Sequence, residues 1–96
     1  MKFITYHVIP TRNFENKEKI GGAYVNCFID SESSNYSQEV AKRQLTKLHW
    51  EIIELEELTI IDQNTVSEEN KNYYEEALID KEVFVFYTYP VEELEE

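Results

Sequence analysis

Apolar residues recur along the chain with two different periods, and these periods separate strands from helices. Four stretches are rich in aromatic and β-branched residues and predict strands: residues 3–9, 23–30, 50–62 and 82–89. Two segments between them, 35–49 and 66–79, carry apolar side chains every three or four positions and predict helices with one buried stripe each. The predicted order is strand, strand, helix, strand, helix, strand.

This order predicts an α+β two-layer sandwich, in which two helices cover one face of a mostly antiparallel sheet. In outline the layout resembles a ferredoxin-like fold with a rearranged or extended start. The sheet has four or five strands, depending on residues 50–62, where the alternation of apolar side chains switches from one face to the other. Because the side-chain period of a strand is two, the switch predicts either a bulge near Glu56 and Glu57 or a separate short strand over residues 58–61.

Local signals predict where some elements begin. Two matches to the capping box predict helix starts: Asn35 with Gln38, and Thr65 with Glu68. Gly21 and Gly22 are the two glycines of the chain, and this pair predicts a turn into the second strand.

Alternation within the strands predicts which side chains the helices cover. If the more aliphatic set faces the helices, the covered residues are Ala23, Val25, Cys27, Ile29, Ile53, Leu55, Val83 and Val85. Residues 3–9 fit either facing, and we place Ile4, Tyr6 and Val8 on the helix side. The opposite face then holds the candidate interface or pocket residues: Phe3, His7, Tyr24, Asn26, Phe28, Glu54, Phe84 and Phe86.

An uncovered face of this kind would be larger and more aromatic than the patches that soluble monomers usually expose. The simplest cover is a second copy of the chain, because two-fold contacts are the commonest way to close a surface. We therefore expect a homodimer in which the aromatic faces meet. Two such faces can also enclose a pocket, where Tyr24, His7 and Asn26 would supply the polar groups.

Charge is distributed unevenly. Residues 1–50 hold seven Lys and Arg against five Asp and Glu, residues 51–96 hold two against fifteen, and the whole chain carries −11. Nucleic acid binding depends on cations that replace phosphate counterions, so neither nucleic acid nor an anionic membrane is an expected partner. We expect one domain over residues 1–90 and an acidic C-terminal tail over residues 91–96.

Residue chemistry points to no metal and no cofactor. His7, His49 and Cys27 are not at the spacing of metal ligands, and the chain has neither a glycine-rich phosphate loop nor a nucleophile elbow. A single cysteine forms no internal disulfide, and the first ten residues do not have the pattern of a signal peptide. We therefore expect a cytoplasmic protein.

Two functions stay open. The first is a small acidic, non-enzymatic interaction module that self-associates and, in a stronger version, masks a basic protein partner, since an acidic surface speeds association with a positive one. The alternative is a small-molecule-binding protein or small enzyme, with a pocket between the two facing sheets of a dimer. His7 would be its acid or base, because the free pKa of histidine lies near neutrality.

Overall fold

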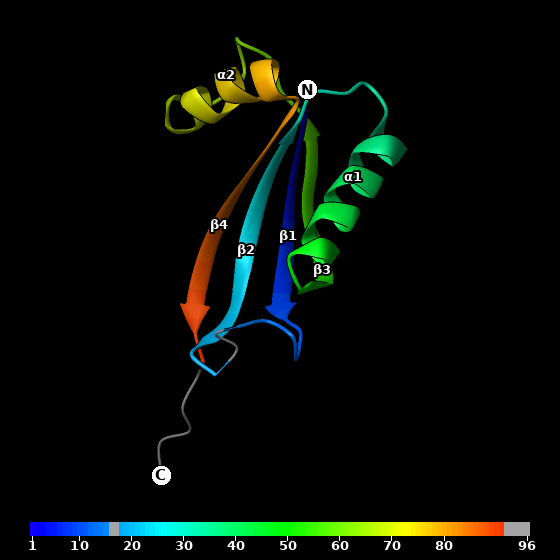
Figure 1. Cartoon of the computed structure of the whole chain (residues 1–96). Coiled ribbons are helices and arrows are strands. Elements are labelled where there is room, and N and C mark those ends of the chain that lie inside the picture. The colour runs from blue at the N-terminus through cyan, green and yellow to red at the C-terminus, as the bar shows by residue number, and fades with distance from the viewer. Residues whose placement is uncertain (16–17, 92–96) are drawn as a thin grey trace.

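The chain folds into four strands and two α-helices, in a computed structural model that describes residues 1–15 and 18–91 (Figure 1). The elements are β1 (Lys2–Pro10), β2 (Ile20–Ile29), α1 (Ser34–Lys47), β3 (Trp50–Ile60), the 3-10 helix η1 (Glu68–Asn70), α2 (Lys71–Asp80) and β4 (Glu82–Pro90). The predicted order of elements is confirmed. The predicted acidic tail falls mostly on residues 92–96, which lie outside the described residues.

The four strands form one antiparallel sheet in the order β3-β1-β2-β4. β1 and β2 are the central pair, running from Lys2 opposite Ile29 to Val8 opposite Ala23. β2 and β3 run in the same direction on the two sides of β1, so β2, α1 and β3 make a βαβ unit that β1 splits. The α+β class and the antiparallel sheet are confirmed, and the wider resemblance to a ferredoxin-like fold stays a prediction.

α1 covers one face of the sheet along β1 and β3 (Figure 1). Its buried side chains repeat at helical spacing: Ser37, Val40, Ala41 and Leu45. They pack on the side chains that the central strands direct to this face: Ile4, Tyr6, Val8, Ala23, Val25, Cys27 and Ile29. Burial of each larger apolar side chain stabilises the fold by about 1.5–3 kcal/mol, so this cluster, the α1 core, is the main source of stability. The predicted facing of the first two strands is confirmed.

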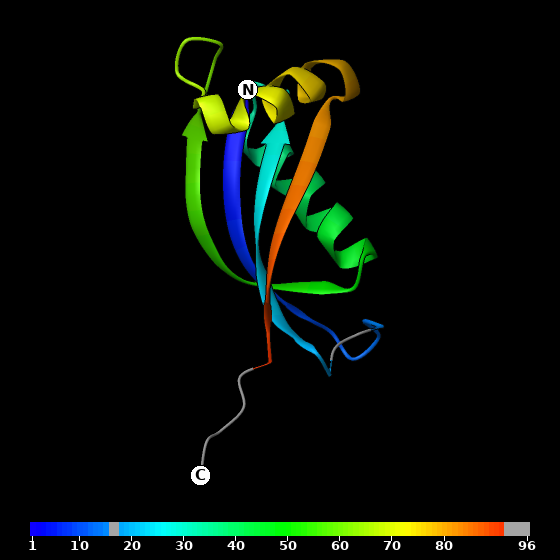
Figure 2. The same cartoon turned by 90° about the vertical axis from the view of Figure 1, so that its left-hand side faces the viewer.

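α2 lies on the opposite face and crosses one end of the sheet (Figure 2). β3 and β4 are the two outer strands, and β4 begins at the same end of the sheet at which β3 finishes. The segment that joins them, which contains α2, therefore only has to cross that end. Tyr73 and Ala77 of α2 pack there on Phe28 and Val83, in a second and smaller core. The prediction that both helices cover one face is therefore wrong.

β3 is one continuous strand whose pairing with β1 shifts twice. Along β1, the paired residue of β3 passes from Glu57 to Leu55 and later from Glu54 to Ile52. Glu56 and Ile53 are therefore left out of the pairing. The predicted bulge near Glu56 is confirmed, and the separate fifth strand is not formed.

The second bulge, at Ile53, reverses the expected facing of the first part of β3. Ile52 packs against the α1 core, whereas Ile53 is 48% exposed. Leu55, opposite Tyr6, is also exposed. The expectation that the helices bury Ile53 and Leu55 is therefore wrong for two different reasons. Ile53 is the extra residue of the bulge, whereas Leu55 is on the α1 side of the sheet, as expected, but is left 45% exposed there.

β4 faces the opposite way from the prediction. Its register places Phe84 opposite Cys27 and Phe86 opposite Val25, and directly opposed residues of antiparallel strands share a face. Both phenyl rings therefore pack against the α1 core, where Phe86 stacks on Trp50 with the ring centroids 5.7 Å apart. β2 presents only small side chains at these positions, and the rings fill the space that they leave.

Val83 and Val85 consequently lie on the other face, in the core under α2. Phe28, which we also expected on an uncovered face, is fully buried there. The prediction that the rings at positions 28, 84 and 86 project away from both helices is wrong. Both alternating sets of β4 are apolar, so alternation alone gives no sign of which set faces α1.

The predicted helix starts are also displaced. Ser33 rather than Asn35 caps α1, because its hydroxyl accepts a backbone N–H of the first turn at 3.1 Å. The Thr65 hydroxyl accepts the N–H of Asp62 at 2.8 Å, inside the preceding loop, and Ser67 caps η1 instead. The capping boxes matched the sequence pattern, but neighbouring serines occupy the cap positions.

Gly21 and Gly22 lie inside β2 rather than in a turn, and neither has a positive φ. What they provide is space for close approach. A Cβ on Gly22 would overlap the phenol of Tyr89, and a Cβ on Gly21 would come within 2.7 Å of the Pro90 carbonyl oxygen. The glycine pair therefore lets Tyr89 reach across β2 toward β1.

Candidate functional site

The sheet face opposite α1 is uncovered where α2 does not cross it, and we call this region the open face (Figure 2). By register its residues are Thr5, His7, Ile9, Tyr24, Asn26, Tyr87, Tyr89, Glu51, Glu54 and Glu57. Tyr24 and Tyr87, which oppose each other on β2 and β4, are 42% and 49% exposed. The open face therefore offers aromatic rings, hydroxyls and carboxylates to the surroundings.

His7 contacts two tyrosines on the open face. Its ring stacks on Tyr24, with centroids 4.4 Å apart and 18° between the planes. Its Nε2 atom lies 2.6 Å from the Tyr89 hydroxyl. Either the phenol donates to a neutral imidazole or Nε2–H donates to the phenol oxygen, so the contact is satisfied in both tautomers. The three side chains brace one another and leave Tyr24 exposed for stacking.

A polar pair continues this surface toward α2. The Thr5 hydroxyl donates to Oδ1 of Asn26 at 2.9 Å, across the β1–β2 pairing. Both side chains are half-buried, so the pair joins the aromatic cluster to the core under α2.

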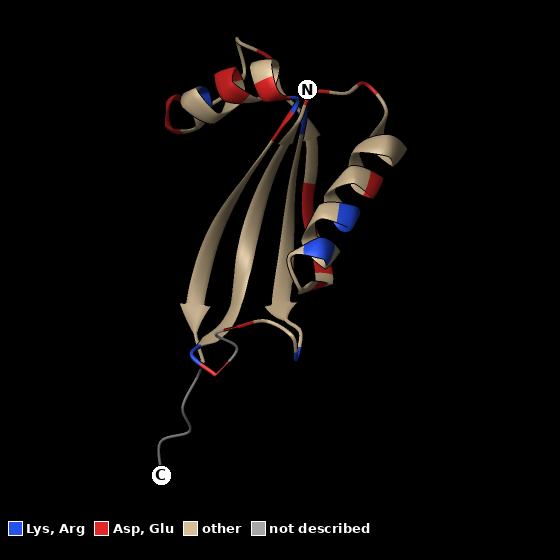
Figure 3. Ribbon diagram, in the orientation of Figure 1, with Lys and Arg blue, Asp and Glu red and all other residues tan. Residues whose placement is uncertain are grey.

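Three exposed glutamates border the open face along β3. Glu51, Glu54 and Glu57 stand opposite Ile9, His7 and Thr5 in the β1–β3 register. The middles of β1, β2 and β4 carry no charged residue, whereas acidic residues gather on β3 and α2 (Figure 3). The open face is thus an uncharged aromatic field with an acidic border.

The structure divides the predicted site residues into two groups. Four of them meet on the open face: His7, Tyr24, Asn26 and Glu54. The other four lie in the two cores, where Phe3 meets Phe28 edge-on at 5.1 Å under α2, and Phe84 and Phe86 pack on the α1 side.

Tyr87 and Tyr89 also belong to the open face, and the sequence-based list missed them. They share the alternation of Val83 and Val85, for which the sequence predicts the helix side. Their contacts depend on the β2–β4 register, and the only local sign of this was the glycine pair opposite the end of β4.

Shallow hollows lie beside the sheet, and two of them reach the glutamates at the border of the open face, Glu57 and Glu51. One of 310 Å³ lies between the end of β3 and η1 and includes Phe3, Glu57 and Val66. Another, of 560 Å³, lies between the end of α1 and the start of β3 and includes Thr46 and Trp50.

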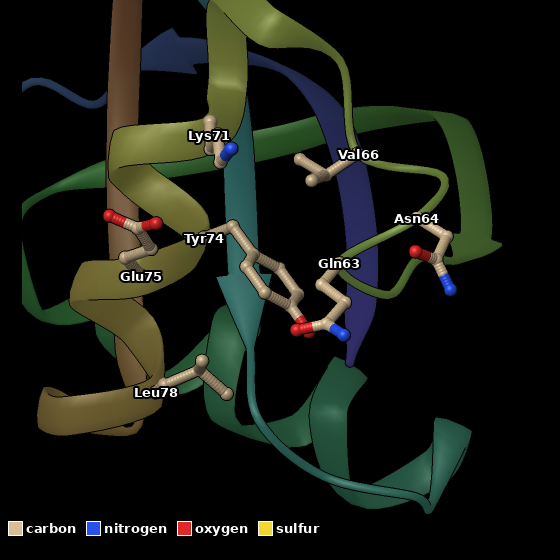
Figure 4. A pocket seen from close by; sticks show the side chains of 7 residues that line it. All are labelled: Gln63, Asn64, Val66, Lys71, Tyr74, Glu75 and Leu78. Carbon is tan, nitrogen blue, oxygen red and sulfur yellow. The ribbon is translucent and has the colours of Figure 1, made fainter.

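A third hollow, of 340 Å³, lies between α2 and the loop before η1 (Figure 4). The Tyr74 ring points to the Gln63 amide there, and Lys71 and Glu75 come from the facing side of α2. His7, the expected acid or base of an enzyme, lines none of these three hollows.

Chemistry-bearing side chains are otherwise scattered. In the described part of the chain, no three His, Cys, Asp or Glu side chains lie close enough together to hold a metal ion. Cys27 is fully buried, and burial raises the pKa of its thiol to about 12, so it stays protonated and unreactive at neutral pH. None of the helices within residues 1–15 and 18–91 has the length and apolar character needed to cross a membrane.

Comparison of the chain with protein families, with curated proteins and with solved structures gives no match.

Proposed function

We propose that this chain is a non-enzymatic binding module whose open face docks on a basic surface of another protein. The observation that carries the proposal is the braced aromatic cluster beside a row of exposed carboxylates on one sheet face. Arginine fits this combination best, because its planar guanidinium both stacks on tyrosine rings and pairs with carboxylates.

The aromatic part is suited to binding because it is already ordered. Tyr24 is held from one side by His7, and His7 is held in turn by Tyr89. A ring that does not have to be immobilised loses little side-chain entropy on binding, and tyrosine is enriched at protein interfaces for this reason. Tyr24 and the neighbouring Tyr87 thus form a platform on which a cation can stack.

Glutamates supply the second part of the recognition. Neighbouring strands lie about 4.8 Å apart, so Glu54 on β3 stands about 10 Å from Tyr24 on β2. A partner that places two or three cations at about this spacing would satisfy both groups. The net charge of −11 also attracts such a partner from a distance and raises the association rate.

The two other hypotheses have less support. A face-to-face homodimer stays a prediction, but the phenyl rings that motivated it lie in the cores, and two acidic borders would repel each other. A pocket with His7 as acid or base also stays a prediction, and the hollows described above lie away from His7.

Binding of a fluorescently labelled hexa-arginine peptide tests the proposal. We expect Glu54→Gln to weaken binding about two- to fivefold, as loss of one exposed ion pair does, and Tyr24→Ala to weaken it further. Glu39→Gln is the matched control, because Glu39 is an exposed residue of α1, on the other side of the sheet. Equal weakening by Glu54→Gln and Glu39→Gln would reduce the effect to general attraction by an acidic protein and would end the proposal.

A further inference from the structure

The outer edge of β4 is unprotected, and docking on the open face makes no use of it. Among the described residues, no strand pairs with this side of β4. Exposed edges of natural sheets normally carry charges, prolines or bulges that prevent pairing. β3, the other outer strand, has two bulges and four glutamates. β4 has no charge, no proline and no shift of register from Val83 to Tyr89.

The register shows which backbone groups point outward from this edge. The N–H of Asp30 donates to the carbonyl of Lys81 at 2.9 Å, so this pair is of the hydrogen-bonded type. Hydrogen-bonded and non-hydrogen-bonded pairs alternate along an antiparallel ladder. Phe84, Phe86 and Thr88 therefore fall at the non-hydrogen-bonded positions, and their N–H and C=O groups point away from β2.

We propose that β4 pairs antiparallel with β4 of a second copy of this chain, centred on Phe86, so that two sheets join edge to edge. This register sets each aromatic side chain beside a β-branched one, apart from Phe86 against itself: Val83 with Tyr89, Phe84 with Thr88, and Val85 with Tyr87. Aromatic and β-branched residues are favourable cross-strand partners. The uncharged segment of β4 is thus complementary to itself.

Shifted registers are less suitable. With the two-fold axis at Tyr87, Phe84 would face Pro90, which has no N–H to donate. With the axis at Val85, Thr88 would face Glu82 and a charge would enter the ladder. Only the axis at Phe86 pairs the outward groups of Phe84, Phe86 and Thr88 among themselves.

The joined sheet has a geometric consequence. Odd-numbered residues of one β4 meet odd-numbered residues of the other, so both open faces lie on the same side. The acidic borders on β3 are then the two outermost edges, far from the contact. This inference does not rest on the proposed function, and the two associations respond to salt concentration in opposite ways. Screening of the like-charged copies should strengthen the dimer, whereas it should weaken binding of an arginine peptide.

Sedimentation equilibrium of the whole chain over a range of concentrations tests the pairing. We expect the mass of two chains at high concentration, with an association that strengthens as salt rises. Thr88→Pro removes an outward N–H from each copy and should weaken the association about tenfold or more. Thr88→Val keeps both that N–H and a β-branched partner for Phe84, so it should change the association less than about twofold. A single-chain mass at every concentration up to about 1 mM would overturn the inference.

Amide hydrogen exchange of the unmodified chain decides the case even if the proline variant does not fold. In the dimer, the outward N–H groups of Phe84, Phe86 and Thr88 should gain protection as protein concentration rises. The inward N–H groups of Val85 and Tyr87 bond to β2 in either state and serve as the control. A two-chain mass without such protection would place the contact on another surface and contradict the pairing.

Discussion

At the scale of single residues, the α1 core contains two buried hydroxyls that find no partner among the described residues, those of Tyr6 and Ser37. Tyr6 is 1% exposed, and its hydroxyl has no hydrogen-bond partner within residues 1–15 and 18–91. An unpaired buried hydroxyl costs about 1–3 kcal/mol, so we expect Tyr6→Phe to raise the free energy of unfolding by about 1 kcal/mol. Urea denaturation measures this change. A loss of more than about 1 kcal/mol would show that the hydroxyl is paired in the folded chain.

Tyr6 and Cys27 also make stability depend on pH at the alkaline end. Burial raises the pKa of the Cys27 thiol from 9.0 to about 12. Burial, together with the neighbouring Cys27, raises the pKa of Tyr6 from 10.0 to about 12. Each group is neutral in both states below its unfolded pKa, so nothing changes there. Above pH 9 the unfolded chain releases protons that the folded chain keeps, and stability falls until about pH 12.

The expected slope is about 1.4 kcal/mol per pH unit for each group that has ionised only in the unfolded state. Denaturation in urea at pH 8, 9.5 and 10.5 would measure it. Cys27→Ala should lower stability at pH 8 but flatten the decline between pH 8 and 9.5, where the thiol contributes more than Tyr6 because its unfolded pKa is lower. An unchanged slope in this variant would show that Cys27 is not the source.

At the scale of elements, each α-helix is followed within two residues by a residue with a positive φ that is not glycine. His49, the second residue after α1, has a φ of 70°, and Lys81, the first residue after α2, has a φ of 78°. This conformation costs a residue with a Cβ about 1 kcal/mol, and glycine adopts it freely. We expect His49→Gly to raise the free energy of unfolding by about 0.5–1 kcal/mol, measured by denaturation. His49→Ala, which keeps the Cβ, should bring no such gain, and an equal gain in both would mean that loss of the imidazole is responsible.

The elements also show what the sequence could predict and what it could not. β2 was assigned correctly because its two faces differ, with Val25 and Cys27 on one side and Tyr24 and Asn26 on the other. β4 was reversed because both of its faces are apolar, so only pairing with β2 decides which rings face α1. In β3, the sequence indicated the bulge at Glu56 through a visible switch of alternation. The bulge at Ile53 leaves no such sign, because its neighbour Ile52 is equally apolar.

For the candidate site, the same distinction applies. Alternation predicts four residues of the open face correctly, because it gives the right facing for β1, for β2 and for part of β3: His7, Tyr24, Asn26 and Glu54. The position of Tyr89 above Gly22 depends on a contact between distant parts of the chain, and its only local sign is the glycine pair.

At the scale of the whole molecule, the placement of the two helices creates the open face. α1 connects β2 to β3 in the split βαβ unit and covers the sheet face opposite the open face. α2 crosses only one end of the sheet, on the same side as the open face. Most of the aromatic side chains therefore pack in two separate cores, and the tyrosines and glutamates of the open face stay uncovered. The fold also places three glutamates of β3 beside the aromatic rings of the open face, on which a cation can stack.

The most direct measurement is a titration of the ¹⁵N-labelled chain with hexa-arginine peptide, followed by amide chemical shifts. We predict that the changes concentrate at Thr5, His7, Tyr24, Glu54 and Tyr87, with little change along α1. Changes spread evenly over the acidic residues, or centred on α2, would contradict the assignment of the open face as the docking surface.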